Sequence, residues 1–203
     1  MANRSAPEWI STKWRAARRR KTNSLHEQLF TLGARTEKPL IAAVRGAALG
    51  GGTGFVANCH IVIAEPSATF GLTEIRLGLW PFLVYRAMEL AVGERRSTEL
   101  ALTGRVFGGE EAKALGLVHE VVPDAESRAL ELAQTIATYS PSAIHNGLSF
   151  VQEVRGMGWE EAGQVARRVR EWVFTGSDFQ EGLRAFREKR QPHWPSLADG
   201  RDS

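Results

Sequence analysis

The sequence predicts an α/β fold with a core followed by a helical C-terminal region, and two patterns carry that prediction. A short apolar run over 40–44, a glycine-rich turn over 46–54 and a small, apolar stretch after it are typical of a strand, a turn and a short buried helix. After residue 124 the apolar residues recur at helical spacing. We therefore expect a core over 24–125 and a helical region over 126–203, preceded by a basic arm over 1–23.

The composition is that of one globular domain. A chain of 203 residues can bury a substantial core. Its one cysteine, Cys59, excludes an internal disulfide framework and fits a reducing compartment. No apolar run reaches transmembrane length, and the N-terminus has no apolar signal-peptide core. We expect a cytoplasmic protein that does not bind membranes.

The N-terminal arm is strongly basic. Six lysines and arginines lie within residues 13–21, next to Trp9 and Trp14. Such a run can bind nucleic acid or another acidic surface, but blocks of like charge are usually solvated tails. We expect a solvated arm, and we do not expect nucleic acid as a partner.

The glycine-rich turn is the first candidate site. Glycines at 50, 51 and 52 let a ligand approach the backbone without a Cβ in the way, so the turn could hold a phosphate or an oxyanion formed during a reaction. The dinucleotide fingerprint does not fit its spacing, and the P-loop lysine is absent from Gly52-Thr53-Gly54. Taken alone, the stretch is equally compatible with a tight turn that packs a strand against a helix.

The elements around this turn follow from apolar periodicity and from glycine stop signals. In chain order we expect a helix over 24–34, a strand over 58–64, a strand-and-turn segment over 68–79, a helix over 85–92 that ends at Gly93, a helix over 94–102 closed by Gly104, a short helix over 110–114 and a strand over 117–121.

Helix signals continue into the C-terminal region. Ser140 is a suitable N-cap, and Pro141 occupies the first helical position after it. A further helix is expected over 159–174. The segment from Ser177 to Gln180 has the pattern of a capping box, which predicts that Ser177 caps the next helix.

A series of short motifs occurs in order between about residues 28 and 195: Lys38-Pro39, Ala48-Leu49-Gly50-Gly51-Gly52, Ile63-Ala64, Phe70-Gly71, Glu74, Leu77-Gly78-Leu79 and Leu102-Thr103-Gly104-Arg105. In these motifs the chain resembles the crotonase superfamily, the enoyl-CoA hydratase/isomerase family. The resemblance implies a ββα spiral core and a C-terminal helical oligomerisation region that forms a homotrimer or a dimer of trimers.

One part of the family pattern is missing. Family members usually carry several N-terminal strands and an A-F-S-A-G-A-D-like motif, which this sequence does not contain. The core is therefore expected to be incomplete at its N-terminal edge. We interpret the chain as a truncated or frameshifted version of a longer gene.

The resemblance also implies the chemistry. The substrate would be an acyl-CoA thioester, with coenzyme A as part of the substrate and no other cofactor or metal. The N–H of Gly51 would be one of two donors to the enolate oxygen, and the other belongs to the missing motif. Hydratases of the family use two glutamates, of which Glu74 is present, whereas Gly54 occupies the second position. A single glutamate favours isomerisation over hydration.

Further substrate-binding residues follow from the same comparison. Leu49 and Gly50 belong to the glycine motif that surrounds the thioester. Trp80 and Phe82 stand where the family commonly has a glycine loop, and they are expected to line an acyl pocket, with a place in the core as the alternative. Lys189 would lie near the phosphates of coenzyme A, and the alternative is an ordinary basic surface residue.

Two other classes of function remain open. The absent motif and Gly54 are also compatible with a catalytically impaired scaffold or interaction subunit. The basic arm is compatible with RNA binding, which would show a steep dependence on salt.

Overall fold

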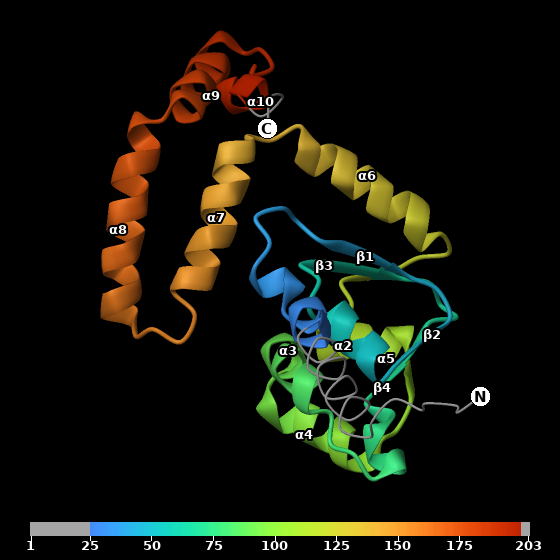
Figure 1. Ribbon diagram of the computed structural model, residues 1–203. Coiled ribbons are helices and arrows are strands. Elements are labelled where there is room, and N and C mark those ends of the chain that lie inside the picture. Colours follow the sequence, from blue (N-terminus) through green and yellow to red (C-terminus); the bar gives the residue numbers. More distant parts are fainter. Residues whose placement is uncertain (1–24, 200–203) are drawn as a thin grey trace, which may run out of the picture.

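Two small three-stranded sheets form the centre of the molecule (Figure 1) in the computed structural model, which describes residues 25–199. The strands of the first sheet, in spatial order, are β1 (Ile41–Val44), β3 (Ile61–Ala64) and β6 (Glu120–Val121), and all are parallel. The strands of the second, in spatial order, are β2 (Ala47–Leu49), β4 (Thr69–Gly71) and β5 (Phe107–Gly108). In that sheet β2 and β4 are parallel, and β5 is antiparallel to β4.

The chain passes from one sheet to the other directly after the first strand. The expected strand over 40–44 is β1, and its register pairs Ile41 with Ile61 and Val44 with Ala64. Gly46, at φ +71°, turns the chain into β2, a three-residue strand that the sequence did not predict. The glycine-rich stretch therefore begins with a strand of the second sheet, and the helix follows it.

Four helices pack around the sheets on the core side: α2 (Gly51–Ala57), α3 (Phe82–Val92), α4 (Glu94–Thr103) and α5 (Gly109–Leu115). Their apolar faces enclose a core that includes the fully buried side chains of Phe70, Leu72, Met88, Leu100 and Leu117. As expected, α3 ends at Gly93 and α4 at Gly104, where φ is positive in both cases. The strand expected over 117–121 is shorter than predicted, since only Glu120 and Val121 pair with β3.

The helical C-terminal region is confirmed. It comprises α6 (Ala125–Ala137), α7 (Pro141–Glu153), α8 (Trp159–Thr175), α9 (Ser177–Glu188) and α10 (Pro195–Asp199). Helix α6 packs on β1 and β3, whereas α7 and α8 form a neighbouring pair and α9 and α10 lie at the end of the molecule farthest from α4 (Figure 1). No helix of the described residues is both long and apolar enough to cross a membrane.

One predicted helix cap is present and another is wrong. The Ser140 hydroxyl accepts the N–H of Ala143 at 2.9 Å, and Pro141 begins α7 as expected. Ser177 does not cap α9, because the helix already includes it and Gly176 occupies the N-cap position without a side-chain hydrogen bond.

The first described residues form the expected helix only in part. Residues 25–30 are helical, and a 3₁₀ turn, η1 (Leu32–Ala34), follows. Gly33 lies within this turn, and a Cβ there would come within 1.6 Å of the carbonyl oxygen of Asn58. The basic arm over 1–23 lies outside the described residues.

Candidate functional site

The glycine turn connects the end of β2 to the first residue of α2. Gly50 adopts φ +54° and ψ −120°, a conformation that favours glycine, and its N–H donates to the carbonyl of Gly71 at 2.7 Å. Gly51 is the first helical residue, so its N–H has no acceptor within the helix. No other acceptor among the described residues takes this N–H group. It is available to a ligand at the start of α2.

A buried hydroxyl fixes the turn from within. The side chain of Thr53 is fully buried, and its Oγ1 lies 2.5 Å from the carbonyl oxygen of Ala48 and 3.0 Å from that of Gly71. The same oxygen accepts the N–H of Gly71 at 3.0 Å. Thr53 thus connects β2, β4 and α2 through one atom. Sequence reasoning missed this residue, because a threonine inside a glycine run carries no periodic signal.

Glu74 lies against the glycine turn. It belongs to the 3₁₀ helix η2 (Thr73–Leu77), which directly follows β4. A Cβ placed on Gly50 would be 3.2 Å from Glu74 Oε1, so the carboxylate and the turn are in contact. Glu74 Oε2 is buried and has no hydrogen-bond partner among the described residues. A buried oxygen without a partner calls for an explanation, and a ligand held at this turn would provide one.

The structure also accounts for Gly54. A Cβ on this residue would lie 2.1 Å from Cγ1 and 2.2 Å from Cβ of Val84, which belongs to α3. Helices α2 and α3 therefore approach each other so closely that only glycine fits at position 54. A second carboxylate at this position would require α3 to move.

Phe30 is a further residue beside the glycine turn. Its ring would come within 3.1 Å of a Cβ on Gly51, and the side chain packs partly against the core. In the sequence, Phe30 belongs only to an apolar helical stripe within the helix expected over 24–34. No local pattern shows that this stripe meets a helix start twenty-one residues later in the chain.

The remaining predicted substrate-binding residues lie in different surroundings. Trp80 packs against the core, with its ring centroid 5.8 Å from that of Tyr85. Phe82 begins α3 and is 73% exposed, and Leu49 is partly exposed beside the glycine turn. Lys189 ends α9 at φ +54°. Because α9 lies at the other end of the molecule from α2 (Figure 1), this chain alone does not bring Lys189 to the turn.

The described residues offer no metal centre. Nowhere in 25–199 do three or more histidine, cysteine, aspartate or glutamate side chains converge in a way that could hold a metal ion. The chemistry available at the turn is that of one carboxylate and one backbone N–H group.

Comparison with known proteins identifies the family. The family model described as enoyl-CoA hydratase/isomerase matches residues 12–197. The chain belongs to the enoyl-CoA hydratase/isomerase family. A crystal structure of an enoyl-CoA hydratase from Bacillus anthracis aligns with a TM-score of 0.82 at 34% identity, covering 88% of this chain and 70% of that one. The crotonase-type fold and the family resemblance expected from the sequence are both confirmed.

Curated relatives agree with this assignment. A putative enoyl-CoA hydratase from Thermus thermophilus is 37% identical over 77% of this chain and 63% of its own length. The enoyl-CoA hydratase EchA19 of Mycobacterium tuberculosis is 39% identical over 80% of this chain and 62% of its own length. A mevalonyl-coenzyme A hydratase of Aspergillus fumigatus is 38% identical over 79% of this chain and 61% of its own length. The chain thus spans less than two thirds of the length of these relatives.

Proposed function

We propose that this chain acts on an acyl-CoA thioester, with Glu74 as the proton carrier and the N–H of Gly51 as a donor to the thioester oxygen. The observation that carries the proposal is the unpartnered, buried carboxylate oxygen of Glu74 beside the turn that begins α2. Membership of the enoyl-CoA hydratase/isomerase family supports the substrate class.

The reaction requires both groups at the same place. When a base removes a proton from a carbon next to the thioester, the electron pair moves onto the carbonyl oxygen and an enolate forms. A backbone donor aimed at that oxygen lowers the barrier, and loss of one such donor typically slows the reaction by about 10² to 10³. Glu74 takes the proton and, when it returns the proton to a different carbon, shifts the double bond without consuming any other reactant.

A single carboxylate favours isomerisation over hydration. Hydration needs one group to activate water and one to protonate carbon, whereas isomerisation moves one proton between two carbons. The contact of Gly54 with Val84 supports the single-glutamate chemistry, because no second carboxylate fits at that position. The curated relatives described above carry hydratase names, and the choice of isomerase is our proposal.

The remaining parts of the proposal concern the substrate and partners. Leu49 and Gly50 would surround the thioester, and Trp80 and Phe82 would bound the acyl chain. In a trimer or a dimer of trimers, Lys189 would contact the phosphates of a coenzyme A bound at the glycine turn of a neighbouring subunit. Coenzyme A enters as part of the substrate, and no other cofactor is required.

Replacement of the carboxylate tests the proposal. Glu74→Gln keeps the shape of the side chain and removes the base, so we expect turnover of a 3-enoyl thioester to fall by about 10² to 10⁴ while binding of the acyl-CoA, measured by calorimetry, stays within a few-fold. Glu171→Gln on the exposed face of α8 is the matched control and should leave both unchanged. Unchanged turnover in Glu74→Gln would show that another group carries the proton.

A second candidate is a catalytically impaired binder of acyl-CoA. It is favoured by the presence of only one of the two expected oxyanion donors, since a missing donor is worth about 3 to 4 kcal/mol of barrier. Under this candidate the unmodified chain binds a 2-enoyl or 3-enoyl thioester but turns neither over. Binding with turnover selects the first proposal, and binding without turnover selects the second.

A further inference from the structure

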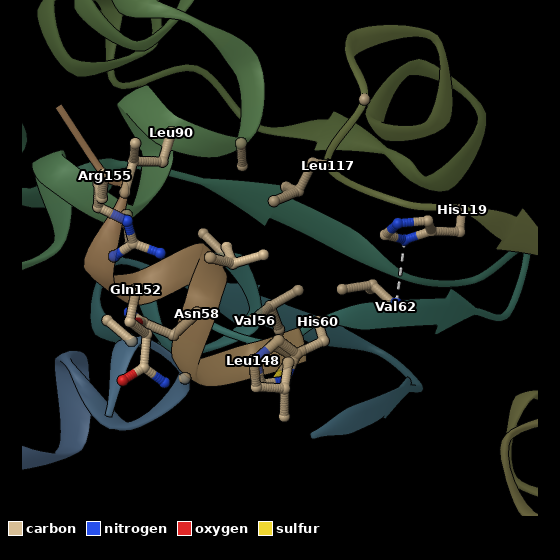
Figure 2. A pocket seen from close by; sticks show the side chains of 18 residues that line it. Val56, Asn58, His60, Val62, Leu90, Leu117, His119, Leu148, Gln152 and Arg155 are labelled. Carbon is tan, nitrogen blue, oxygen red and sulfur yellow. Dashed lines mark hydrogen bonds between the residues drawn. The ribbon is translucent and has the colours of Figure 1, made fainter. Parts of the chain in front are cut away.

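A cavity of about 300 Å³ lies at the other end of α2 from the glycine turn. Its walls come from the last residues of α2, from the middle of α3 and from α7 with the turn that follows it (Figure 2). None of the residues assigned above to thioester chemistry lines it. The volume is at the lower end of the range for small-molecule sites.

The residues that line this cavity include one arginine and no carboxylate. Arg155, directly after α7, is the only charged residue among the cavity-lining residues, none of which is an aspartate or a glutamate. Gln152, which also lines the cavity, donates through its Nε2 to the carbonyl oxygen of Thr36 at 3.2 Å, and Figure 2 shows it near Arg155. Arg155 forms no ion pair with any residue of 25–199. Among the described residues, the one formal charge at the wall of this cavity is therefore the solvent-exposed guanidinium group of Arg155.

The two histidines of the cavity do not add to this charge. His60 Nδ1 accepts the N–H of Leu40 at 2.9 Å, and His119 Nδ1 accepts the N–H of Val62 at 3.1 Å (Figure 2). In both side chains Nδ1 acts as a hydrogen-bond acceptor, the role of an unprotonated ring nitrogen. Burial lowers the pKa of His60; a hydrogen bond to the Gly33 backbone opposes this, and the charge of Arg155 adds to the lowering. Arg155 remains the single cation of the site.

Part of the wall is apolar. Leu90, Leu148 and Val151 face the cavity from α3 and α7, and small alanines of α3 leave the space between them open. A ligand that fits this cavity needs an anionic group to bind the guanidinium and a short hydrocarbon part to contact the apolar side chains. Arginine is well suited to a carboxylate, which it can bind through two parallel N–H donors.

We propose that this cavity binds a small aliphatic carboxylate, with its head group on Arg155 and its chain against Leu90, Leu148 and Val151. The site is separate from the thioester site and does not depend on the function proposed above. A carboxylate bound there would connect α7 to α2 and α3, because all three contribute to its walls.

The only cysteine of the chain provides a direct reporter, because Cys59 lines the same cavity. Iodoacetate and iodoacetamide alkylate thiols in the same way but differ in charge. Burial raises the pKa of Cys59, but the ratio of the two alkylation rates at one pH is independent of the fraction of thiolate. We expect this ratio to be about two- to fivefold higher in the native chain than in the urea-unfolded chain, as one ion pair with an exposed arginine would predict.

Competition and substitution complete the test. Butyrate should slow alkylation by iodoacetate in the native chain, whereas 1-butanol at the same concentration should not. Arg155→Gln should bring the rate ratio of the native chain down to that of the unfolded chain and should remove the protection by butyrate. Arg167→Gln, on the exposed face of α8, should change neither.

Each contrary result overturns the proposal. An equal rate ratio in the native and unfolded chain would show that the cavity does not select anions. Equal protection by butyrate and 1-butanol would show a merely apolar cavity. Protection that survives Arg155→Gln would show that Arg155 does not bind the head group. The comparison of the two reagents uses the unmodified chain, so the proposal is decided even if the Arg155 variant fails to fold.

Discussion

At the scale of single residues, Gly54 shows how a side chain can be excluded by packing. A methyl group there would overlap Val84, whose Cβ is attached to the backbone of α3 and cannot rotate away. We expect Gly54→Ala to lower the free energy of unfolding by about 1 to 3 kcal/mol, as overpacked cores do. Gly163→Ala in α8, where a Cβ meets nothing within 4 Å, should be neutral or stabilising by up to about 1 kcal/mol. Urea unfolding of the two variants checks this, and equal stabilities would contradict the close packing of α2 on α3.

The residues of the candidate site differ in how far sequence could predict them. Glu74 and Gly51 were recognised because each belongs to a motif of fixed spacing, and the structure places Glu74 beside the same turn. Phe30 and Thr53 were missed because their roles depend on contacts with residues far away in the chain or with backbone atoms. Such contacts leave no local pattern, so only the folded structure shows them.

At the scale of elements, the hydroxyl of Thr53 holds β2, β4 and α2 in register. Thr53→Val keeps the shape but leaves the N–H of Gly71 and the carbonyl of Ala48 without this buried partner. We expect a loss of about 2 to 4 kcal/mol in the free energy of unfolding, because an unsatisfied buried polar group costs about 1 to 3 kcal/mol. Thr135→Val on the exposed face of α6 is the control and should change it by less than about 0.5 kcal/mol. Denaturation in urea measures both, and similar losses would refute the special role of Thr53.

Helix α9 contains a carboxylate, Glu181, whose ionisation stabilises the fold. Glu181 receives two hydrogen bonds from Arg190, at 2.6 and 3.2 Å, and one from the N–H of His193 at 2.9 Å. These bonds, led by those from Arg190, lower the pKa of Glu181 from 4.5 to about 2. Because the folded pKa is the lower one, the stabilisation is present above pH 4.5 and is lost as the pH falls toward 2.

This linkage predicts that the difference in urea midpoint between Glu181→Gln and the unmodified chain depends on pH. Glu181→Gln should lower the urea midpoint at pH 7, and the difference from the unmodified chain should shrink steadily between about pH 4.5 and pH 2. Glu171→Gln, on the exposed face of α8, should give the same midpoint as the unmodified chain at each pH. A difference for Glu181→Gln that stays constant over this range would show that its ionisation is not coupled to folding.

Elements were predictable where the signal is local. The start of α7 followed from Ser140 and Pro141, and the ends of α3 and α4 from their glycines. Strand β2 was missed because three residues of alanine and leucine have little β-propensity, and its pairing with β4 decides its conformation. The prediction that Ser177 is an N-cap was wrong because α9 begins at Ser177 itself, and Gly176 occupies the N-cap position.

At the scale of the whole molecule, the C-terminal helices expose more apolar surface than a lone appendage normally does. The side chains of Trp159, Trp172 and Phe186 are 97%, 63% and 82% exposed, and all belong to α8 or α9. The sequence predicted amphipathic helices but could not show which apolar faces would remain uncovered, since that depends on how α7, α8 and α9 pack. Large exposed apolar areas usually mark an interface.

We therefore expect the chain to self-associate through its C-terminal helical region. Sedimentation should show an average mass that rises with concentration, and Trp172→Glu combined with Phe186→Glu should shift it toward the monomer, because a charge buried in an apolar interface is costly. Leu102→Glu is the control: Leu102 is also 61% exposed but lies on α4, on the core side, and the variant should associate like the unmodified chain. A monomer mass independent of concentration would contradict self-association, and equal effects of the two sets of substitutions would place the interface elsewhere. Self-association bears on the thioester site, because Lys189 ends the same α9 and can reach a glycine turn only if that turn belongs to a neighbouring copy.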